Sequence, residues 1–234
     1  MIFYVNGDSH TTAAEAVNPH AFAEDDKNLV HLGRLPHPDN LAVSWGKKLS
    51  TLLKMAFFCD AESASSNDRI IRTTKEWITN YTQDYSNLFV VIGWSTWERE
   101  EWLIDDVYYQ INASGTDIVP DSHNEKYKEY VIGVNWRHKT NQAHKDVIAL
   151  HEWLEEKDIK HVFFNGNNTF SQINTKYDFG SAYIEPYNKG FSYNDHLLAN
   201  GSHTVSPNSY HFGEYGHTTW SKYLLKYIVK NNLI

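Results

Sequence analysis

Short apolar runs and longer amphipathic stretches alternate along the chain. The apolar runs predict buried strands, because strands that are covered on both faces show no polar alternation. They lie at 2–5, 54–59, 88–92 and 161–164, with a short fifth strand at 183–184. Apolar residues at helical spacing predict helices between the strands. These are expected at 11–17, at 41–53 with Asn40 as the cap, at 69–81, from 98–102 onward, at 138–157 and at 214–229.

Strands that alternate with helices favour an α/β fold. We expect a three-layer α/β/α sandwich with a flavodoxin-like parallel sheet of about five strands and right-handed crossovers. With 234 residues, the chain is long enough for a single domain over 1–234 with a well-buried core. Residues 105–137 mix aromatic, glycine and acidic positions, and we interpret them as an insertion. Segments 18–40 and 189–210 are rich in turn formers and are expected to be loops.

Composition narrows the classes of partner. The formal net charge is −8, whereas nucleic-acid-binding proteins generally present a basic face, so no nucleic-acid partner is expected. No apolar run approaches membrane-spanning length, and a single cysteine excludes an internal disulfide and a multi-cysteine zinc site. Because the first strand is expected to begin at once, no cleavable signal peptide is expected. A cytoplasmic location is the default expectation, with release by lysis or packaging in a particle as alternatives.

The end of the first strand carries the first candidate for chemistry. Asn6 and Gly7 turn the chain, and Ser9 follows directly. In open α/β sheets, ligands and catalytic groups gather at the carboxyl ends of the strands, where a serine on a tight turn can act as a nucleophile. The same residue types are also the commonest turn formers. A polar turn that caps the next helix is therefore an equally good interpretation of these residues.

A serine nucleophile needs a base that takes its proton and donors that hold the oxyanion. Histidine is the usual base, but with 13 histidines in the chain their presence alone proves nothing. His211 is favoured by its placement, because it ends the long loop just before the last helix. That position is again a rim of the expected sheet.

These two segments resemble the SGNH, or GDSL, hydrolase superfamily. Gly7-Asp8-Ser9 matches the family's first block directly after the first strand, and Asn208-x-x-His211 matches the position of its last block, Asp-x-x-His. The resemblance covers nearly the whole chain in the correct order. It implies the SGNH hydrolase fold and a serine esterase of the lipase or acetylhydrolase type.

The family's second and third blocks fall after the second and third strands. The resemblance implies an oxyanion hole made by the backbone amides of Ser9 and Ala64 and by the hydroxyl of Ser95. Ala64 stands where the family has glycine, and Ser95 where it has asparagine, whose amide reaches further than a hydroxyl. Ser95 and Thr96 fit equally well as caps of a helix that begins near Glu98.

Three residues are expected to support these turns, and one to face the substrate. The turn residues are Gly7, Asp8 and Gly93. The simplest role for Asp8 is to close the turn with an Asx-type hydrogen bond from its side chain to the backbone. Trp94 follows the third strand directly. Among the tryptophans near the expected site, it has the best chance of contacting a substrate.

The last block contains the most serious departure from the family pattern. Asn208 stands where the family has aspartate, and an amide orients the histidine poorly and does not stabilise the imidazolium. Three hypotheses follow. The site works as a Ser9–His211 dyad oriented by Asn208 or a backbone carbonyl; another acid, with Asp195 as first candidate, replaces the aspartate; or the site is weak or inactive.

The function expected from these residues is the hydrolysis of acyl esters. An acyl-enzyme would form on Ser9 with His211 as base, and O-acetylated carbohydrate is one class of substrate. No cofactor, metal ion or membrane partner is expected. One alternative is a catalytically weak or inactive binding module on the same fold. Another is a metal-dependent phosphoesterase, because Asp8-x-His10 looks like the opening of that family's metal site, although its Gly-Asp and Gly-Asn-His runs are missing.

Overall fold

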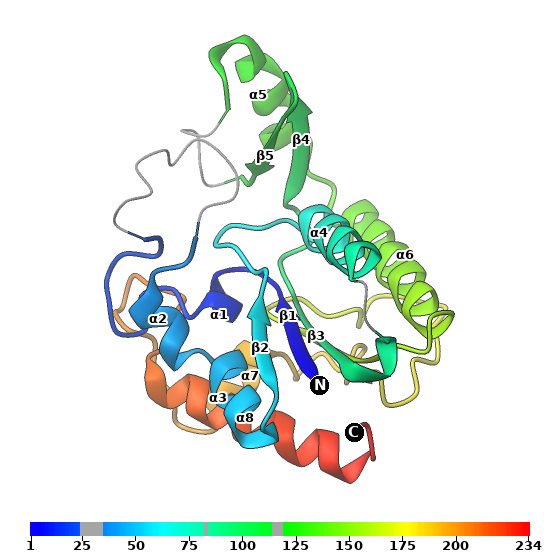
Figure 1. Ribbon diagram of the computed structural model, residues 1–234. Coiled ribbons are helices and arrows are strands. Elements are labelled where there is room, and N and C mark those ends of the chain that lie inside the picture. Colours follow the sequence, from blue (N-terminus) through cyan, green and yellow to red (C-terminus); the bar gives the residue numbers. More distant parts are fainter. Residues whose placement is uncertain (24–34, 82–83, 114–118) are drawn as a thin grey trace.

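The protein is built around a five-stranded parallel sheet. The computed structural model describes residues 1–23, 35–81, 84–113 and 119–234, so part of the loop expected at 18–40 lies outside the described residues. The strand order is β2-β1-β3-β6-β7, with every neighbouring pair parallel (Figure 1). The strands are β1 (Ile2–Asn6), β2 (Ala56–Cys59), β3 (Leu88–Trp94), β6 (Lys160–Asn165) and β7 (Tyr183–Ile184).

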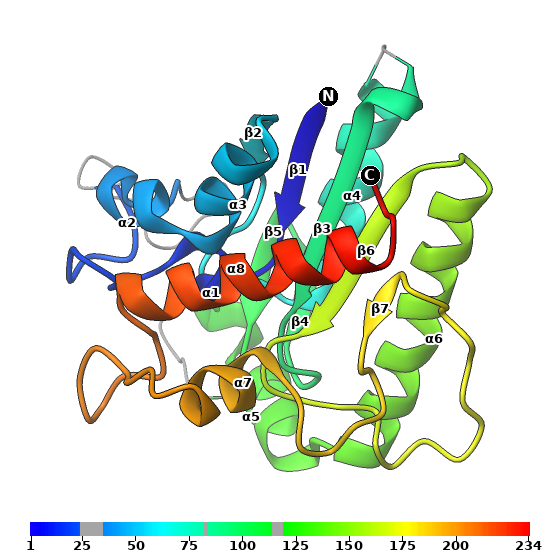
Figure 2. The same cartoon turned by 90° about the horizontal axis from the view of Figure 1, so that it is seen from below.

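Helices cover both faces of the sheet. One face carries α4 (Asn67–Asn80) and α6 (Trp136–Glu155), and the other carries α3 (Trp45–Leu53) and α8 (Glu214–Lys230), as Figures 1 and 2 show. Three short helices complete this part of the chain: α1 (Ser9–Thr12), α2 (Pro38–Val43) and α7 (Tyr193–Ala199). The predicted three-layer α/β/α sandwich with a parallel sheet is thus confirmed.

Side chains of the central strands alternate between two hydrophobic clusters. Tyr4 and Val90 pack toward α4 and α6, whereas Phe3, Val5 and Val91 pack toward α3 and α8. Each of these side chains is fully buried. Because successive residues of a strand point to opposite faces, an unbroken apolar run is what a doubly covered strand requires. The unbroken apolar runs therefore indicate that helices cover both faces of the strands.

The amphipathic stretch at 41–53 is two helices and not one. Ser44 ends α2 and also caps α3, because its hydroxyl accepts a hydrogen bond from the amide of Lys47 at 3.1 Å. Asn40, the predicted cap, lies inside α2, where its side chain binds the backbone of Val17 and Asn18. That prediction is wrong because the helix begins at Pro38 and is capped by His37, whose side chain accepts a hydrogen bond from the amide of Asp39.

The helix predicted from Glu98 is a β-hairpin. Strands β4 (Glu100–Ile104) and β5 (Val107–Ile111) pair antiparallel across Asp105 and Asp106, which have φ values of 48° and 63°. Two consecutive left-handed residues form the turn that matches the twist of a two-residue hairpin. Ser95 and Thr96 therefore cap no helix at Glu98.

The hairpin and α5 (Asn124–Gly133) project from the body of the protein (Figure 1). They share a small hydrophobic cluster of their own, which includes Trp102, Tyr109 and Tyr127. Two 3₁₀ turns, Tyr85–Asn87 and Asp121–His123, precede β3 and α5. That residues 105–137 are an insertion in a single domain stays a prediction. The loop expected at 189–210 contains the helix α7.

The strand order determines where a site can form. Chain order reverses between β1 and β3, because β2 lies on one side of β1 while β6 and β7 lie beyond β3. At such a switch point the loops after the two strands part and leave a crevice at the carboxyl edge of the sheet. Ser9 follows β1 and Ser95 follows β3, so both lie at this edge.

Replacing Gly7 by alanine is expected to destabilise the fold by about 2–3 kcal/mol, because the new methyl group has no space. An added Cβ would lie 2.1 Å from Oγ1 of Thr11 and 2.8 Å from the carbonyl oxygen of Gly93. Gly133→Ala is the matched control, since no atom lies within 4 Å of the Cβ position and the residue ends a helix. Chemical denaturation of both variants measures the difference, and equal stabilities would contradict this expectation.

Candidate active site

Ser9 lies at the mouth of a cavity at the switch point. Asp8 caps α1 by accepting the amide of His10 at 3.0 Å, and Ser9 is the first residue of that helix. The cavity has a volume of about 670 Å³, and its lining includes Ser9, His10 and His211. The structure therefore brings into one cavity the hydroxyl and the imidazole that the sequence pattern favours, which are separated by about 200 residues in the chain.

His211 is oriented by Glu15. Its Nδ1 lies 2.9 Å from Oε2 of Glu15, and the same carboxylate oxygen accepts a hydrogen bond from the hydroxyl of Ser209 at 2.6 Å. Burial would raise the pKa of Glu15, but the hydrogen bonds from Ser209 and His211 outweigh it and hold the pKa below its usual value. With its Nδ1 hydrogen donated to a carboxylate, the imidazole keeps a lone pair on Nε2, which is the form a general base needs.

The loop that carries His211 is fixed by short backbone contacts. Thr204 and Phe212 form an antiparallel bridge, and the amide of Val205 donates to the carbonyl oxygen of His211 at 2.9 Å. Phe212 is buried in the cluster under α8. The imidazole therefore extends from an anchored segment and not from a free loop.

Glu15 takes the place that the resemblance assigns to position 208. Asn208 forms no hydrogen bond with His211 within the described part of the chain. Asp195, the other predicted acid, accepts from the hydroxyl of Ser192 at 2.7 Å and so belongs to the N-terminal cap of α7. The carboxylate next to the imidazole is therefore that of Glu15 and belongs to neither of these two positions.

Asp8 and Ser95 form a closed network with Arg99. The hydroxyl of Ser95 donates to Oδ2 of Asp8 at 2.8 Å, and Nη1 of Arg99 lies 2.8 Å from that hydroxyl and 3.3 Å from the carboxylate. Burial alone would raise the pKa of Asp8, but the neighbouring His10 and Arg99 and the Ser95 hydroxyl hold it below its usual value. The single hydrogen of the Ser95 hydroxyl is already donated. The oxyanion role expected for Ser95 therefore does not fit this arrangement.

The other two expected oxyanion donors are backbone amides, those of Ser9 and Ala64. The Ser9 amide is at the first position of α1, which has no partner within its own helix. Ala64 also lines the cavity, and its φ of 68° is in the left-handed region. A left-handed alanine costs roughly 1–2 kcal/mol, which explains why glycine suits this turn better. Ala64 nevertheless presents the same backbone amide that a glycine would.

Trp94 does not face the cavity. It is the last residue of β3, its ring is 1 % exposed, and it packs edge-on against Phe163 with ring centroids 5.1 Å apart. The expectation that Trp94 contacts substrate is therefore wrong, because the strand continues through it and directs the ring into the core. Gly93 sits against Phe164, where an added Cβ would approach the ring to 2.7 Å. Gly93 lies inside β3 and not in a turn after it, so the turn expected at this residue begins later in the chain.

His10 is the second imidazole in the cavity. Its ring lies 5.5 Å from that of His211, and its Nε2 lies 3.3 Å from Nδ2 of Asn167. Burial lowers the pKa of His10 to about 4, against the opposing effect of Asp8, so the ring is neutral at pH 7. The imidazole that contacts the ring of His211 therefore carries no charge at pH 7.

Sequence reasoning missed Glu15 and Arg99. Glu15 belongs to no motif, and it was expected inside a short helix at 11–17, whereas α1 ends at Thr12. Arg99 was expected inside a helix and instead precedes β4. The only signal in the sequence was that both are charged residues a few positions beyond a strand end at the switch point.

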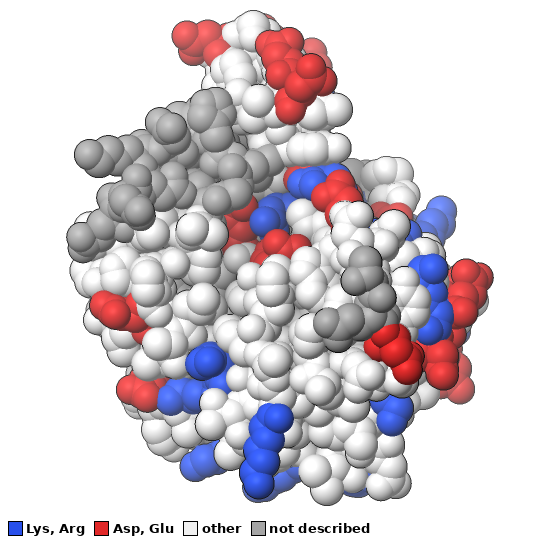
Figure 3. Space-filling view, in the orientation of Figure 1, with Lys and Arg blue, Asp and Glu red and all other residues white. Residues whose placement is uncertain are grey.

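No cluster of metal ligands forms in this cavity among the described residues. Within residues 1–23, 35–81, 84–113 and 119–234, three such side chains come together only at His151, Glu155 and His161, which lie elsewhere. In the part of the chain that the structure describes, no helix is both long and apolar enough to cross a membrane. On the face in Figure 3, basic side chains are scattered among acidic and neutral ones.

The comparison with protein families identifies the chain. A model described as "Family of unknown function (DUF6071)" matches residues 36–184, which is more than half of the 234 residues. The chain belongs to the DUF6071 family. The matched segment covers the second and third strands and the hairpin, but it includes neither Ser9 nor His211. No curated protein matches this DUF6071 chain.

Solved structures resemble the DUF6071 chain at low identity. The esterase EstA from Pseudoalteromonas sp., in a structure inhibited by monoethylphosphonate, has a TM-score of 0.51 at 11 % identity and covers 98 % of this chain and 97 % of its own. A lipolytic protein of the G-D-S-L family from Veillonella parvula has a TM-score of 0.49 at 11 % identity, covering 97 % of both chains. An acetyl xylan esterase from Butyrivibrio proteoclasticus has a TM-score of 0.48 at 12 % identity, covering 100 % of this chain and 65 % of its own. The similarity to EstA shows a shared fold.

Proposed function

We propose that this DUF6071 protein is a serine hydrolase of the SGNH type that cleaves acyl esters. One observation carries the proposal: Ser9 and His211 line one cavity at the switch point of the sheet, and Nδ1 of His211 is 2.9 Å from a carboxylate. Nucleophile, base and acid are the three parts that acyl transfer through a serine requires.

In the proposed reaction, His211 takes the proton of Ser9 through Nε2 as the Ser9 oxygen attacks the acyl carbonyl. Glu15 holds the imidazole in the required tautomer and stabilises the imidazolium that forms. The imidazolium then gives its proton to the departing alcohol, and an acyl-enzyme remains on Ser9. Water, activated by the same imidazole, releases the acid and restores the hydroxyl.

The developing oxyanion is bound by the backbone amides of Ser9 and Ala64. Ser95 is left out of this group, because its hydroxyl donates to Asp8. Its role is structural: with Arg99 it fixes the Asp8 carboxylate, and Asp8 caps the helix that begins with the nucleophile. Backbone donors that are held in this way need little reorganisation when negative charge develops on the substrate oxygen.

The lining of the cavity favours an ester with a polar alcohol. Asn167, Asn194 and Arg99 bring amide and guanidinium groups to the cavity, and Phe22 and Tyr210 add two aromatic rings. A few polar groups beside aromatic rings suit a sugar, because the polar groups can bind its hydroxyls and the rings can pack against its apolar face. Small acyl esters of carbohydrate are therefore the substrate class we propose.

The phosphoesterase alternative fits this geometry less well. It requires the Asp8 carboxylate to bind a metal ion, but that carboxylate already receives Ser95, Arg99 and the amide of His10. The guanidinium of Arg99 is itself the cation beside Asp8. A metal ion there would have to displace it.

Labelling with an alkyl phosphonate fluoride tests the proposed nucleophile. We expect one label per chain, mapped by peptide mass spectrometry to Ser9 and not to Ser63, the other serine that lines the cavity. Ser50→Ala is the control that keeps labelling, because Ser50 lies in α3, and its hydroxyl donates to the carbonyl oxygen of Lys47. Folded protein that takes up no label at Ser9 would overturn the assignment.

A further inference from the structure

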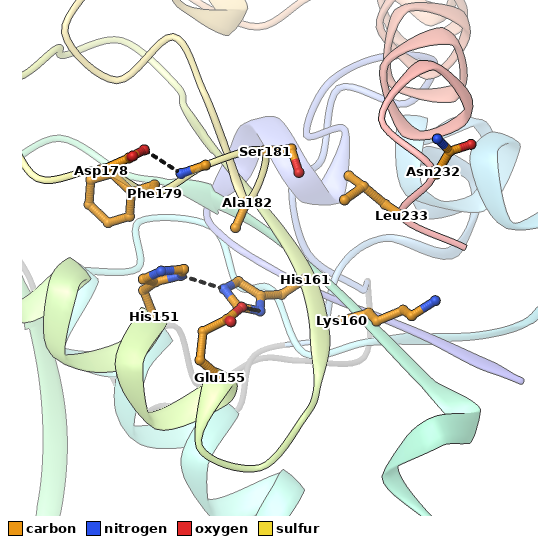
Figure 4. A pocket seen from close by; sticks show the side chains of 11 residues that line it. His151, Glu155, Lys160, His161, Asp178, Phe179, Ser181, Ala182, Asn232 and Leu233 are labelled. Carbon is orange, nitrogen blue, oxygen red and sulfur yellow. Dashed lines mark hydrogen bonds and ion pairs between the residues drawn. The ribbon is translucent and has the colours of Figure 1, made fainter.

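A second cavity lies at the opposite edge of the sheet. Its volume is about 480 Å³, and its lining includes His151, Glu155 and His161 (Figure 4). His161 is the second residue of β6, at the amino end of a parallel strand. Ser9 follows the carboxyl end of β1, so the two cavities are separate, and a ligand in the second cavity would be independent of the proposed hydrolase function.

Two nearly buried imidazoles face each other in this cavity. Nδ1 of His151 lies 2.8 Å from Nε2 of His161, and the exposed fractions of the two residues are 6 % and 3 %. His151 and Glu155 are one turn apart on α6, so both side chains project from the same face of the helix. One potential ligand atom from each of the three residues lies within 4.8 Å of the other two. Oε1 of the exposed Glu155 lies 3.9 Å from Nδ1 of His161, so this side chain has to rotate toward Nε2 to bind the same ion.

The orientation of His161 is that of a metal ligand. Its Nδ1 lies 2.8 Å from the backbone carbonyl oxygen of Ile159, which accepts the ring hydrogen there. A hydrogen bond from the second ring nitrogen to a carbonyl is the usual outer support of a ligating histidine, because it fixes the tautomer and leaves the other nitrogen with a lone pair. Burial lowers the pKa of His161 to about 4 and also lowers the pKa of His151, so both rings are neutral at pH 7.

We propose that His151, Glu155 and His161 form a binding site for one divalent transition-metal ion, with zinc as the best fit. Two imidazoles and one carboxylate are a ligand set that zinc uses, with water in the fourth position. Tetrahedral Zn–N bonds of about 2.0–2.1 Å would place the two nitrogens about 3.3 Å apart, so the rings need to separate by about half an ångström.

Binding requires a change of tautomer but no change in total protonation of the pair. His161 already presents its Nε2 lone pair. His151 moves its hydrogen from Nδ1 to Nε2, which frees Nδ1 for the ion, and the direct hydrogen bond between the rings is replaced by two bonds to the metal. The ion would join the last turn of α6 to the start of β6.

Calorimetric titration of tag-free, chelator-treated protein with zinc chloride tests the site. We expect one equivalent of zinc to bind, and its saturation to raise Tm by about 5–10 °C. Glu155→Gln is expected to weaken binding at least tenfold, and His151→Ala to abolish it. Because Glu155 is exposed, its replacement leaves the fold intact, and Glu156→Gln is the matched control that keeps wild-type affinity.

Cobalt substitution gives a second readout. We expect the visible absorption of four-coordinate Co²⁺ in the wild-type protein and its loss in His151→Ala. Absence of stoichiometric binding would overturn the proposal. So would binding that is unchanged in both Glu155→Gln and His151→Ala, or binding that His211→Ala removes, since that result would place the ion in the other cavity.

Discussion

Ser9→Ala is expected to lower kcat/KM for p-nitrophenyl acetate by about 10³-fold or more. Without the hydroxyl, no acyl-enzyme can form, and only oxyanion binding and substrate positioning remain to assist attack by water. The side chain is small and 7 % exposed, and it caps no helix, because Asp8 does so. We therefore expect the circular dichroism spectrum and Tm of the variant to match those of the wild type.

The control for Ser9→Ala is a buried serine outside the cavity. Ser50→Ala removes the same atom from α3 and is expected to keep wild-type activity. Full activity in Ser9→Ala would reject the nucleophile. No turnover in the wild-type protein, with any small acyl ester, would favour a binding module on this fold instead.

Glu15→Gln is expected to lower kcat by about 10²- to 10⁴-fold while KM changes little. A glutamine can donate its amide hydrogen to Nδ1 of His211, which moves the ring hydrogen to Nε2 and removes the lone pair that the reaction needs. It also removes the negative charge that stabilises the imidazolium. Steady-state kinetics, with separate kcat and KM values, measures the effect.

Three further variants test whether Glu15, and not position 208 or Asp195, supplies the acid of the triad. Glu214→Gln, a matched change in the surface ion pair with Lys48, is expected to leave activity unchanged. Asn208→Asp is expected to give no gain, because Glu15 already binds the imidazole. A large gain in Asn208→Asp, or a loss in Asp195→Asn that exceeds the loss in Glu15→Gln, would contradict the proposed triad.

The strands could be predicted because each is a local pattern. The run Leu88 to Ile92 is apolar throughout, and no amphipathic helix has that composition, so a strand covered on both faces was the only good interpretation. The parallel sheet followed from the helices between the strands. Ser9 and His211 could be proposed because each lies beside an element end that the sequence marks.

The hairpin shows where local reasoning failed. Pairing buries Trp102 and Ile104 of one strand and Tyr109 and Ile111 of the other, but the turn at Asp105-Asp106 lacks the glycine that usually marks a two-residue hairpin. A short mixed segment then resembles the start of a helix. Only the partner strand and the small cluster beneath it decide between the two.

Local sequence patterns were enough to predict the alternation of strands and helices, the parallel sheet, and the two element ends that carry a hydroxyl and an imidazole. These features depend on residues that are close together in the chain, and they are visible in the spacing of apolar residues that is typical of strands or of helices. The folded arrangement was needed to find that Glu15 is the carboxylate beside His211, 196 positions away, that the Ser95 hydroxyl donates to Asp8, and that Trp94 is buried. Such contacts depend on how separate segments meet at the edge of the sheet, and no local pattern in the chain encodes that meeting.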